Sequence, residues 1–202
     1  VTFLEPTISM EEFQKNLFAH TLSSKTSNFN ASLKGRTTNV KLACDFCDNI
    51  ILNPGDEFSY NGSVGPRTYE RGFKDATVYV AGTTEEGVGG GICQVSSTIY
   101  TAALHADLEI TERYNHSYTV TYVPLGEDAT VVYGAKDFRF RNNTDYPIKL
   151  DISYGGSSMT VKILGTNLTN KSVKISTTTL SKTPFETVYQ LDETLPVDTT
   201  KV

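Results

Sequence analysis

A cysteine follows a run of glycines at the start of a predicted helix. Cys93 comes directly after Gly89, Gly90, Gly91 and Ile92, and the next residues repeat apolar side chains at helical spacing: Val95, Ile99, Ala102, Ala103 and Ala106. In the first turn of a helix, unpaired N–H groups and the positive end of the dipole favour an anion, so a thiol there loses its proton more easily. The pattern predicts a nucleophilic Cys93 whose own N–H, together with that of Gln94, holds an oxyanion.

Two interpretations of Cys93 follow from its residue type. Free cysteines are among the most buried residues, and many only fill a core. The glycine run and the flanking Gln94 and Ser96 favour the functional interpretation. On this view Gly90, Gly91, Gln94 and Ser96 are candidates for contact with a substrate.

A cysteine nucleophile needs a base, and three histidines are available. His20 lies in a polar N-terminal region. His105 lies on the cysteine's own helix, about 18 Å farther along at 1.5 Å per residue, and is too far away. His116 opens the β-rich run after that helix and is the predicted base; the alternative is a structural or surface histidine.

The base needs an orienting group. If residues 115–123 pair with 129–137 as a hairpin, Asp137 lies within one residue of facing His116, and Asp128 lies at the turn. The sequence therefore favours Asp137, with Asp128 as the second choice; an amide or a backbone carbonyl is a further alternative. The order of cysteine, histidine and acid follows the logic of papain-like acyl transfer.

The remaining patterns predict an α+β fold, in which an antiparallel sheet packs against a few helices. A helix is expected after Ser9, with Glu12 at the capping-box position, and a second over 38–49. Residues 148–154 and 159–164 alternate around a Gly-Gly turn and predict a hairpin. Further strands are expected at 58–60, 77–81, 114–123, 129–133 and 136–141, turns at 61–62 and 82–87, and a polar extended or loop segment over 23–35.

Composition restricts the possible functions. The 202 residues suit one large domain, or one domain with appendages, and the net charge of −5 without a basic cluster argues against nucleic acid. No run of 18 apolar residues is present, so no membrane segment is expected within this sequence. The chain begins with Val1 and shows no signal peptide. We therefore expect an excised part of a longer protein, with any export signal or anchor upstream.

The other two cysteines form a C-x-x-C at Cys44 and Cys47. They continue the apolar spacing of a helix, which favours core packing; a disulfide or redox role is the alternative. Zinc would need two more ligands, and no second pair has the spacing for it. We expect no metal and no cofactor.

Much of the chain resembles a known family. The polar loop over 63–76 carries Arg67 and Arg71, which could hold a carboxylate of a substrate; the alternative is that they are solvated or paired within the protein. Residues 36–165 resemble a VanW domain, and the tail resembles the lead-in to a G5-type β module. The stretches that carry the VanW resemblance are 36–43, 53–61, 64–68, 72–76, 89–98, 122–124, 128–131 and 137–144.

The resemblance implies a division into an N-terminal helix and extended lead-in (1–35), a catalytic domain (36–165) and a C-terminal extension or start of a G5-like module (166–202). It also implies L,D-transpeptidation of peptidoglycan outside the cell membrane, with Cys93 as nucleophile and His116 in the matching context. Stem peptides would be both donor and acceptor. By residue type, Arg67, Arg71, Arg139 and Arg141 are candidates for holding stem carboxylates, and Tyr122 for lining the site. A cysteine peptidase and a non-catalytic wall-binding module are the alternatives.

Overall fold

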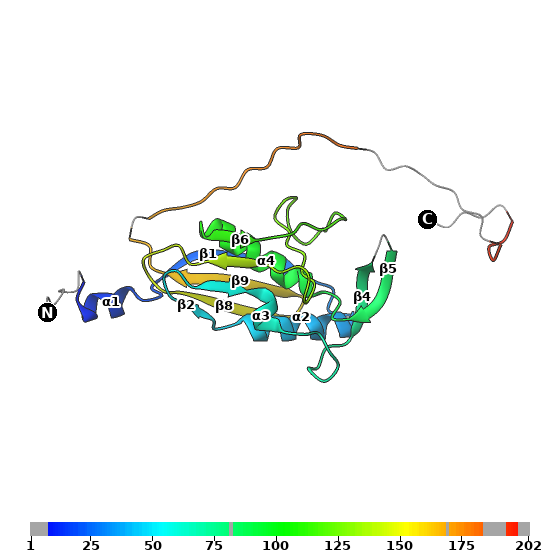
Figure 1. The fold of residues 1–202 in the computed structure, drawn as a ribbon, viewed down its shortest axis with the longest axis horizontal. Coiled ribbons are helices and arrows are strands. Elements are labelled where there is room, and N and C mark those ends of the chain that lie inside the picture. Colours follow the sequence, from blue (N-terminus) through cyan, green and yellow to red (C-terminus); the bar gives the residue numbers. More distant parts are fainter. Residues whose placement is uncertain (1–7, 81–82, 169, 184–192, 198–202) are drawn as a thin grey trace.

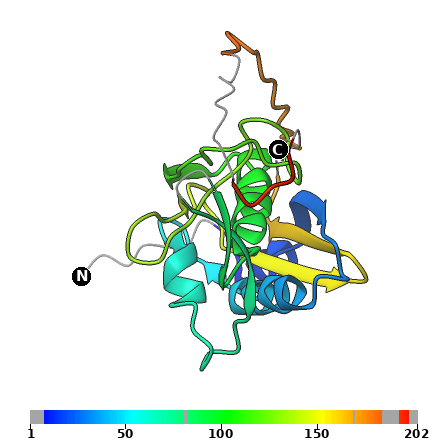
Figure 2. The same ribbon diagram turned by 90° about the vertical axis from the view of Figure 1, so that its right-hand side faces the viewer.

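The computed structural model describes residues 8–80, 83–168, 170–183 and 193–197. Its main layer is an antiparallel sheet in the order β1-β9-β8-β2, formed by His20–Asn28, Ser158–Gly165, Ile148–Gly155 and Ile51–Leu52. On β8 and β9, buried side chains alternate with partly exposed ones, so only one face of the sheet is covered. Helices α2 (Lys34–Cys47) and α4 (Ile92–His105) pack against the covered face (Figures 1 and 2).

The predicted hairpin and the predicted α+β class are confirmed. Strands β8 and β9 pair from Lys149–Leu164 to Gly155–Ser158, around Gly156 at φ 57°. Residues 20–28, expected in part as an extended lead-in, form β1 and pair with β9 over its whole length. Part of the expected lead-in is therefore an edge strand of the main sheet.

Helix α4 lies at the centre of the molecule. It contacts β1 and β9 of the main sheet and also β6 (Glu109–Glu112) of a second sheet, β3-β7-β6, whose other strands are Glu57–Ser59 and Arg139–Arg141. Aromatic rings fill the second interface: Tyr100 meets Phe138 edge-on at 5.6 Å between ring centroids, and Phe58 stacks on Phe140. Because both sides are covered, nearly every residue of α4 is buried, its serines and threonines included.

The remaining elements lie around this centre. Helix α1 (Met10–Asn16) is capped as predicted, since the Ser9 hydroxyl accepts from the Glu12 N–H at 3.1 Å. Helix α3 spans Tyr60–Val64, where a turn was expected. Strands β4 (Asp75–Val80) and β5 (Thr83–Val88) form a two-stranded hairpin at the end of the molecule opposite α1 (Figure 1).

Three other predictions of secondary structure were wrong. Residues 82–87 were expected to form a turn, yet Thr83–Val88 is β5. Its sequence, Thr-Thr-Glu-Glu-Gly-Val, carries no apolar alternation that would mark it as a strand. Residues 114–123 and 129–133 were expected to be strands, but the chain between β6 and β7 is irregular apart from a bridge between Val132 and Lys136.

Cys44 and Cys47 lie inside the core, where the sequence pattern places them. Both are free and fully buried, and the Cys44 sulfur lies 3.5 Å from the sulfur of Met159. Burial raises the pKa of Cys44 to about 12 and that of Cys47 well above its ordinary value. Such thiols are poor nucleophiles at neutral pH.

In the described part of the chain no helix is both long and apolar enough to cross a bilayer.

Candidate active site

Glycines place Cys93 in the first turn of α4. Gly91, the N-cap, has φ 100° and ψ −15°, a left-handed conformation that favours glycine. A Cβ on Gly91 would lie 2.7 Å from Cγ of Arg36, and one on Gly90 would lie 2.6 Å from the carbonyl oxygen of Thr77. The loop therefore packs too closely for side chains, and this close approach brings the start of α4 against β4.

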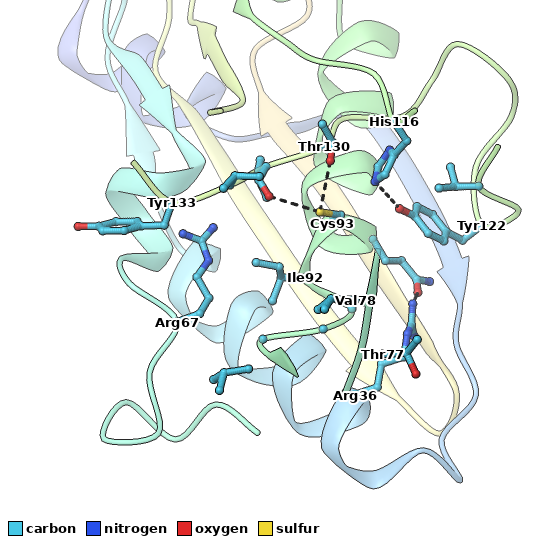
Figure 3. Close-up of a pocket in the computed structure, with 18 of the residues that line it drawn as sticks. Arg36, Arg67, Thr77, Val78, Ile92, Cys93, His116, Tyr122, Thr130 and Tyr133 are labelled. Atoms are coloured by element: carbon cyan, nitrogen blue, oxygen red, sulfur yellow. Dashed lines mark hydrogen bonds between the residues drawn. The ribbon is translucent and has the colours of Figure 1, made fainter. Parts of the chain in front are cut away.

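The Cys93 thiol faces a loop segment that the sequence analysis did not connect with it. Its Sγ lies 3.8 Å from the Thr130 hydroxyl and 3.7 Å from the Val131 carbonyl oxygen (Figure 3). Burial works to raise the pKa of Cys93. Hydrogen bonding to His116 and to the Val131 backbone, with the charge of His116, outweighs burial, so the pKa is lowered. The thiol is thus prepared to ionise.

His116 stands next to Cys93 and is anchored by Asp128. Its Nδ1 lies 2.7 Å from Asp128 Oδ2, and its backbone N–H donates to the same oxygen at 2.6 Å. Arg113 donates to Asp128 Oδ1 at 2.8 Å and to the Asp128 carbonyl at 2.7 Å. Burial works to lower the pKa of His116, but hydrogen bonds and charges of Cys93 and Asp128 raise it overall. With Nδ1 toward Asp128, Nε2 is available to exchange a proton with the thiol.

The favoured assignment of Asp137 as the orienting acid was wrong; the second choice, Asp128, holds that position. The Asp137 carboxylate accepts from the Ser59 hydroxyl at 2.6 Å, the Asn61 N–H at 2.8 Å and Arg139 Nε at 3.0 Å. These contacts cap α3 and join it to β7, so the carboxylate serves the second sheet.

Polar side chains of α4 explain why Asp128 reaches the site. The Ser96 hydroxyl donates to the Ala129 carbonyl at 2.7 Å, the Ser97 hydroxyl accepts from the Ala129 N–H at 2.9 Å, and the Thr101 hydroxyl donates to the Glu127 carbonyl at 3.1 Å. The segment on both sides of Asp128 is therefore fastened along the helix that begins with the cysteine. Ser96, expected as a substrate contact, has this structural role instead and is fully buried.

Cys93 and His116 open into a cleft of about 760 Å³. The cleft is bordered by the glycine loop, by Thr77 and Val78 of β4, and by the irregular segments 119–122 and 130–133 (Figure 3). Arg36 and Arg67 are the arginines in its wall. Within the described residues, no group of three or more His, Cys, Asp or Glu side chains is placed to hold a metal ion.

Comparison with known proteins adds the family. Residues 35–164 match the family model described as VanW like protein. The chain belongs to the VanW-like family. It is 42% identical over 158 residues to Uncharacterized protein YoaR of Bacillus subtilis (strain 168), and 30% identical over 117 residues to the Vancomycin B-type resistance protein VanW of Enterococcus faecalis (strain ATCC 700802 / V583).

These alignments cover 78% and 55% of this chain, but only 52% and 42% of the two relatives. The chain therefore spans about half the length of the relatives it matches. No solved structure matches it. Cys93, His116 and Asp128 all lie inside the region that matches the VanW family.

Strand β1 lies outside the region matched by the family model, yet it contributes to the VanW site through contacts with Gln94. Gln94, next to the cysteine and almost fully buried, donates through Nε2 to the Ser27 hydroxyl at 3.0 Å and the Asn28 carbonyl at 2.7 Å, both on β1. Its Oε1 accepts from Arg36 at 2.6 Å. Gln94 thus connects the first turn of α4 to β1 and α2, and its side chain positions the turn.

The two predicted oxyanion donors, the backbone N–H groups of Cys93 and Gln94, differ in whether they are free to donate. Among the residues that the structure describes, the Cys93 N–H has no acceptor and can donate to a ligand. The Gln94 N–H already donates to the Gly91 carbonyl at 3.1 Å. Tyr122 is a further polar group at the cysteine: its hydroxyl lies 3.3 Å from His116 Nε2, and burial raises its pKa, so that it stays protonated.

Three of the four predicted carboxylate-binding arginines lie outside the cleft. Arg71 donates to the Val64 carbonyl and stacks on Phe46. Arg139 and Arg141 form ion pairs with the glutamates of β3 and β6 on the second sheet. The expectation that these three arginines contact a substrate at Cys93 is therefore corrected: they lie outside the cleft, and their charges already make contacts within the fold.

Several residues of the VanW site escaped the sequence analysis. Arg113 supports Asp128, Thr130 and Val131 contact the thiol, and Arg36 and Tyr133 border the cleft. The stretch 128–131 belongs to the family resemblance, and this was the only signal for Thr130 and Val131. Nothing in the spacing marks Arg113 or Arg36, because their partners are distant in the sequence.

Proposed function

We propose that this VanW-like chain is a cysteine acyltransferase, specifically an L,D-transpeptidase that cross-links peptidoglycan stem peptides. The observation that carries the proposal is the meeting of three groups at the head of α4. Cys93 has a lowered pKa, His116 has a raised one, and Asp128 lies 2.7 Å from Nδ1 of that histidine. A thiol–imidazole pair oriented by a carboxylate is the arrangement that acyl transfer through a thioester requires.

In the proposed reaction, Nε2 of His116 takes the thiol proton and the Cys93 sulfur attacks the carbonyl of the third stem residue. The Cys93 N–H, which has no acceptor among the described residues, donates to the oxyanion. The bond to the terminal D-Ala then breaks, and the imidazolium protonates the departing amine. An amine of a second stem attacks the thioester, His116 accepts its proton, and the regenerated thiolate leaves the new 3→3 amide.

The choice of substrate comes from the family. VanW domains of clostridial type are linked to this reaction, and the enterococcal relative carries the name of a vancomycin-resistance protein. Peptidoglycan lies outside the cell membrane, so the proposal includes an exported or membrane-anchored parent protein. The cleft of about 760 Å³ is of the size that holds a peptide of a few residues.

The test uses tetrapeptide-stem muropeptides and intact-mass spectrometry, with wild type beside Cys93→Ala. We expect an acyl adduct on Cys93 with loss of D-Ala and then a cross-linked dimer; neither should form with the variant. Cleaved tripeptide without dimer would identify a cysteine peptidase, in which water resolves the thioester. Stem binding without adduct, cleavage or dimer, from protein with an unchanged thermal melt, would favour a non-catalytic wall-binding module.

A further inference from the structure

Arg67 is held on one side of the cysteine, opposite the base. Figure 3 shows Arg67 and Tyr133 on one side of Cys93, and His116 and Tyr122 on the other. The arginine stem packs against the glycine loop, where a Cβ on Gly89 would lie 2.9 Å from Cβ of Arg67. The guanidinium carbon lies 5.6 Å from the ring centroid of Tyr133 and 5.7 Å from that of Tyr60. The two rings therefore hold the guanidinium at the cleft wall.

The charge of Arg67 is only partly compensated by the protein. Its Nη atoms donate to two neutral acceptors, the Gly65 carbonyl at 2.9 Å and the Asn61 side-chain oxygen at 2.7 Å. Its Nε is buried and has no partner among the described residues. Arg67 forms no ion pair in the described part of the chain. Arg71 shares this feature and also has a buried Nε without a partner there, but it lies outside the cleft, whereas Arg113, Arg139 and Arg141 each form an ion pair.

A half-buried cation without an anionic partner is costly to maintain. Burial accordingly lowers the pKa of Arg67, although Tyr60, Cys93 and Asp137 act in the opposite direction. A guanidinium whose plane is fixed by aromatic rings binds a carboxylate through two parallel hydrogen bonds. The arrangement is therefore suited to an anionic group that arrives with a ligand.

We propose that Arg67 binds a carboxylate on the acyl-donor part of the stem peptide; this rests on the function proposed above. His116 must protonate the departing amine, so the leaving residue and later the acceptor lie on the His116 side of Cys93. Arg67 lies on the other side, where the retained acyl part extends. A stem offers two carboxylates there: the α-carboxylate of a γ-linked D-Glu at the second position, and the side-chain carboxylate of a diamino diacid at the third.

The experiment measures stem binding apart from chemistry. Calorimetry with Cys93→Ala, alone and combined with Arg67→Met or Arg67→Lys, uses three tetrapeptides: one with both carboxylates free, one amidated at the second residue and one amidated at the third. We expect Arg67→Met to weaken binding of the free peptide about 10- to 100-fold, as for loss of a charge-assisted hydrogen bond. Arg67→Lys should retain part of the affinity, because it keeps the charge without the fork.

Amidation identifies which carboxylate is bound. Amidating that position should weaken binding to the Arg67 protein as much as Arg67→Met does, and should have no further effect on the Met variant. Arg141→Gln in the same background is the matched control, since Arg141 lies outside the cleft, and it should bind like its parent. Thermal melting verifies that each variant is folded, and Arg67→Lys keeps the test available if Arg67→Met does not fold.

Equal binding by Arg67 and Arg67→Met, or indifference to amidation at both positions, would overturn the proposal. Absence of binding by every stem would overturn it too. Binding as expected without any thioester on wild-type Cys93 would support this role for Arg67 and refute only the proposed transpeptidation.

Discussion

Replacing Asp128 with asparagine should slow the reaction of Cys93 with an alkylating reagent. In the protein the Asp128 carboxylate accepts from the His116 N–H at 2.6 Å, contacts Nδ1 at 2.7 Å and accepts from Arg113 at 2.8 Å. Both side chains of the histidine–aspartate pair are close to nine-tenths buried, at 11% and 12% exposure, so solvent screens the interaction weakly. Asparagine preserves the shape and removes the charge that stabilises the imidazolium.

The magnitude follows from the value of such a bond. A hydrogen bond to a charged group contributes about 1.5–3 kcal/mol, and about 1.4 kcal/mol corresponds to a factor of ten. Alkylation requires the thiolate, and the thiolate is stabilised by the His116 imidazolium. The rate of modification of Cys93 by iodoacetamide at pH 7 should therefore fall about 10- to 100-fold in Asp128→Asn, followed by intact mass.

Asp137→Asn is the matched control. Its carboxylate joins α3 to β7 and does not contact His116, so the substitution should lower the melting temperature while leaving the alkylation rate of Cys93 within about twofold. An Asp128→Asn protein that melts normally and alkylates as fast as wild type would refute the reasoning. If Asp137→Asn alone slowed the alkylation of Cys93, Asp137 would be the acid that orients His116, as the sequence favoured.

Four further predictions concern the same site and the core cysteines. In Cys93→Ala the pKa of His116, followed by NMR of its ring protons, should fall, because Cys93 is among the groups that raise it; an unchanged value would contradict the thiol–imidazole coupling. Because the pKa of His116 is raised in the folded wild type, its imidazolium stabilises the fold fully below the ordinary histidine pKa of about 6.5. This contribution is lost as the pH rises through the pKa of His116 in the folded protein. Between these two pKa values, wild type should therefore lose more stability than Cys93→Ala. Gly91→Ala should lower the melting temperature by about 2–8 °C, from about 1–2 kcal/mol of left-handed strain, with a contact to Arg36 adding to it; equal melting temperatures would show that the loop relaxes freely. Thiol titration of the native protein should count one reactive cysteine, Cys93, and after denaturation three; two or three in the native state would revive a role for the C-x-x-C.

Local patterns predicted the parts of the fold that local forces determine. The cap at Ser9, the glycine-led start of α4 and the hairpin over 148–164 each depend on residues close in sequence, and each is found in the structure. Strand β5 was missed because it is a strand only through its pairing with β4, and no apolar face marks it in the sequence. Predictions from pattern fail where the deciding contact carries no periodicity.

The error at Asp137 has the same origin and shows what the site depends on. A hairpin register was assumed for 115–137, but the backbone of 127–129 satisfies several of its hydrogen bonds with the hydroxyls of α4. Serines and threonines in a helix sequence are read as weak helix formers on a solvent face, whereas on this helix they are buried and bind a neighbouring loop. Because those hydroxyls lie one to two turns beyond Cys93, they set the distance from the thiol at which Asp128, and through it His116, is held. The helix that supplies the nucleophile therefore also positions the residues that activate it.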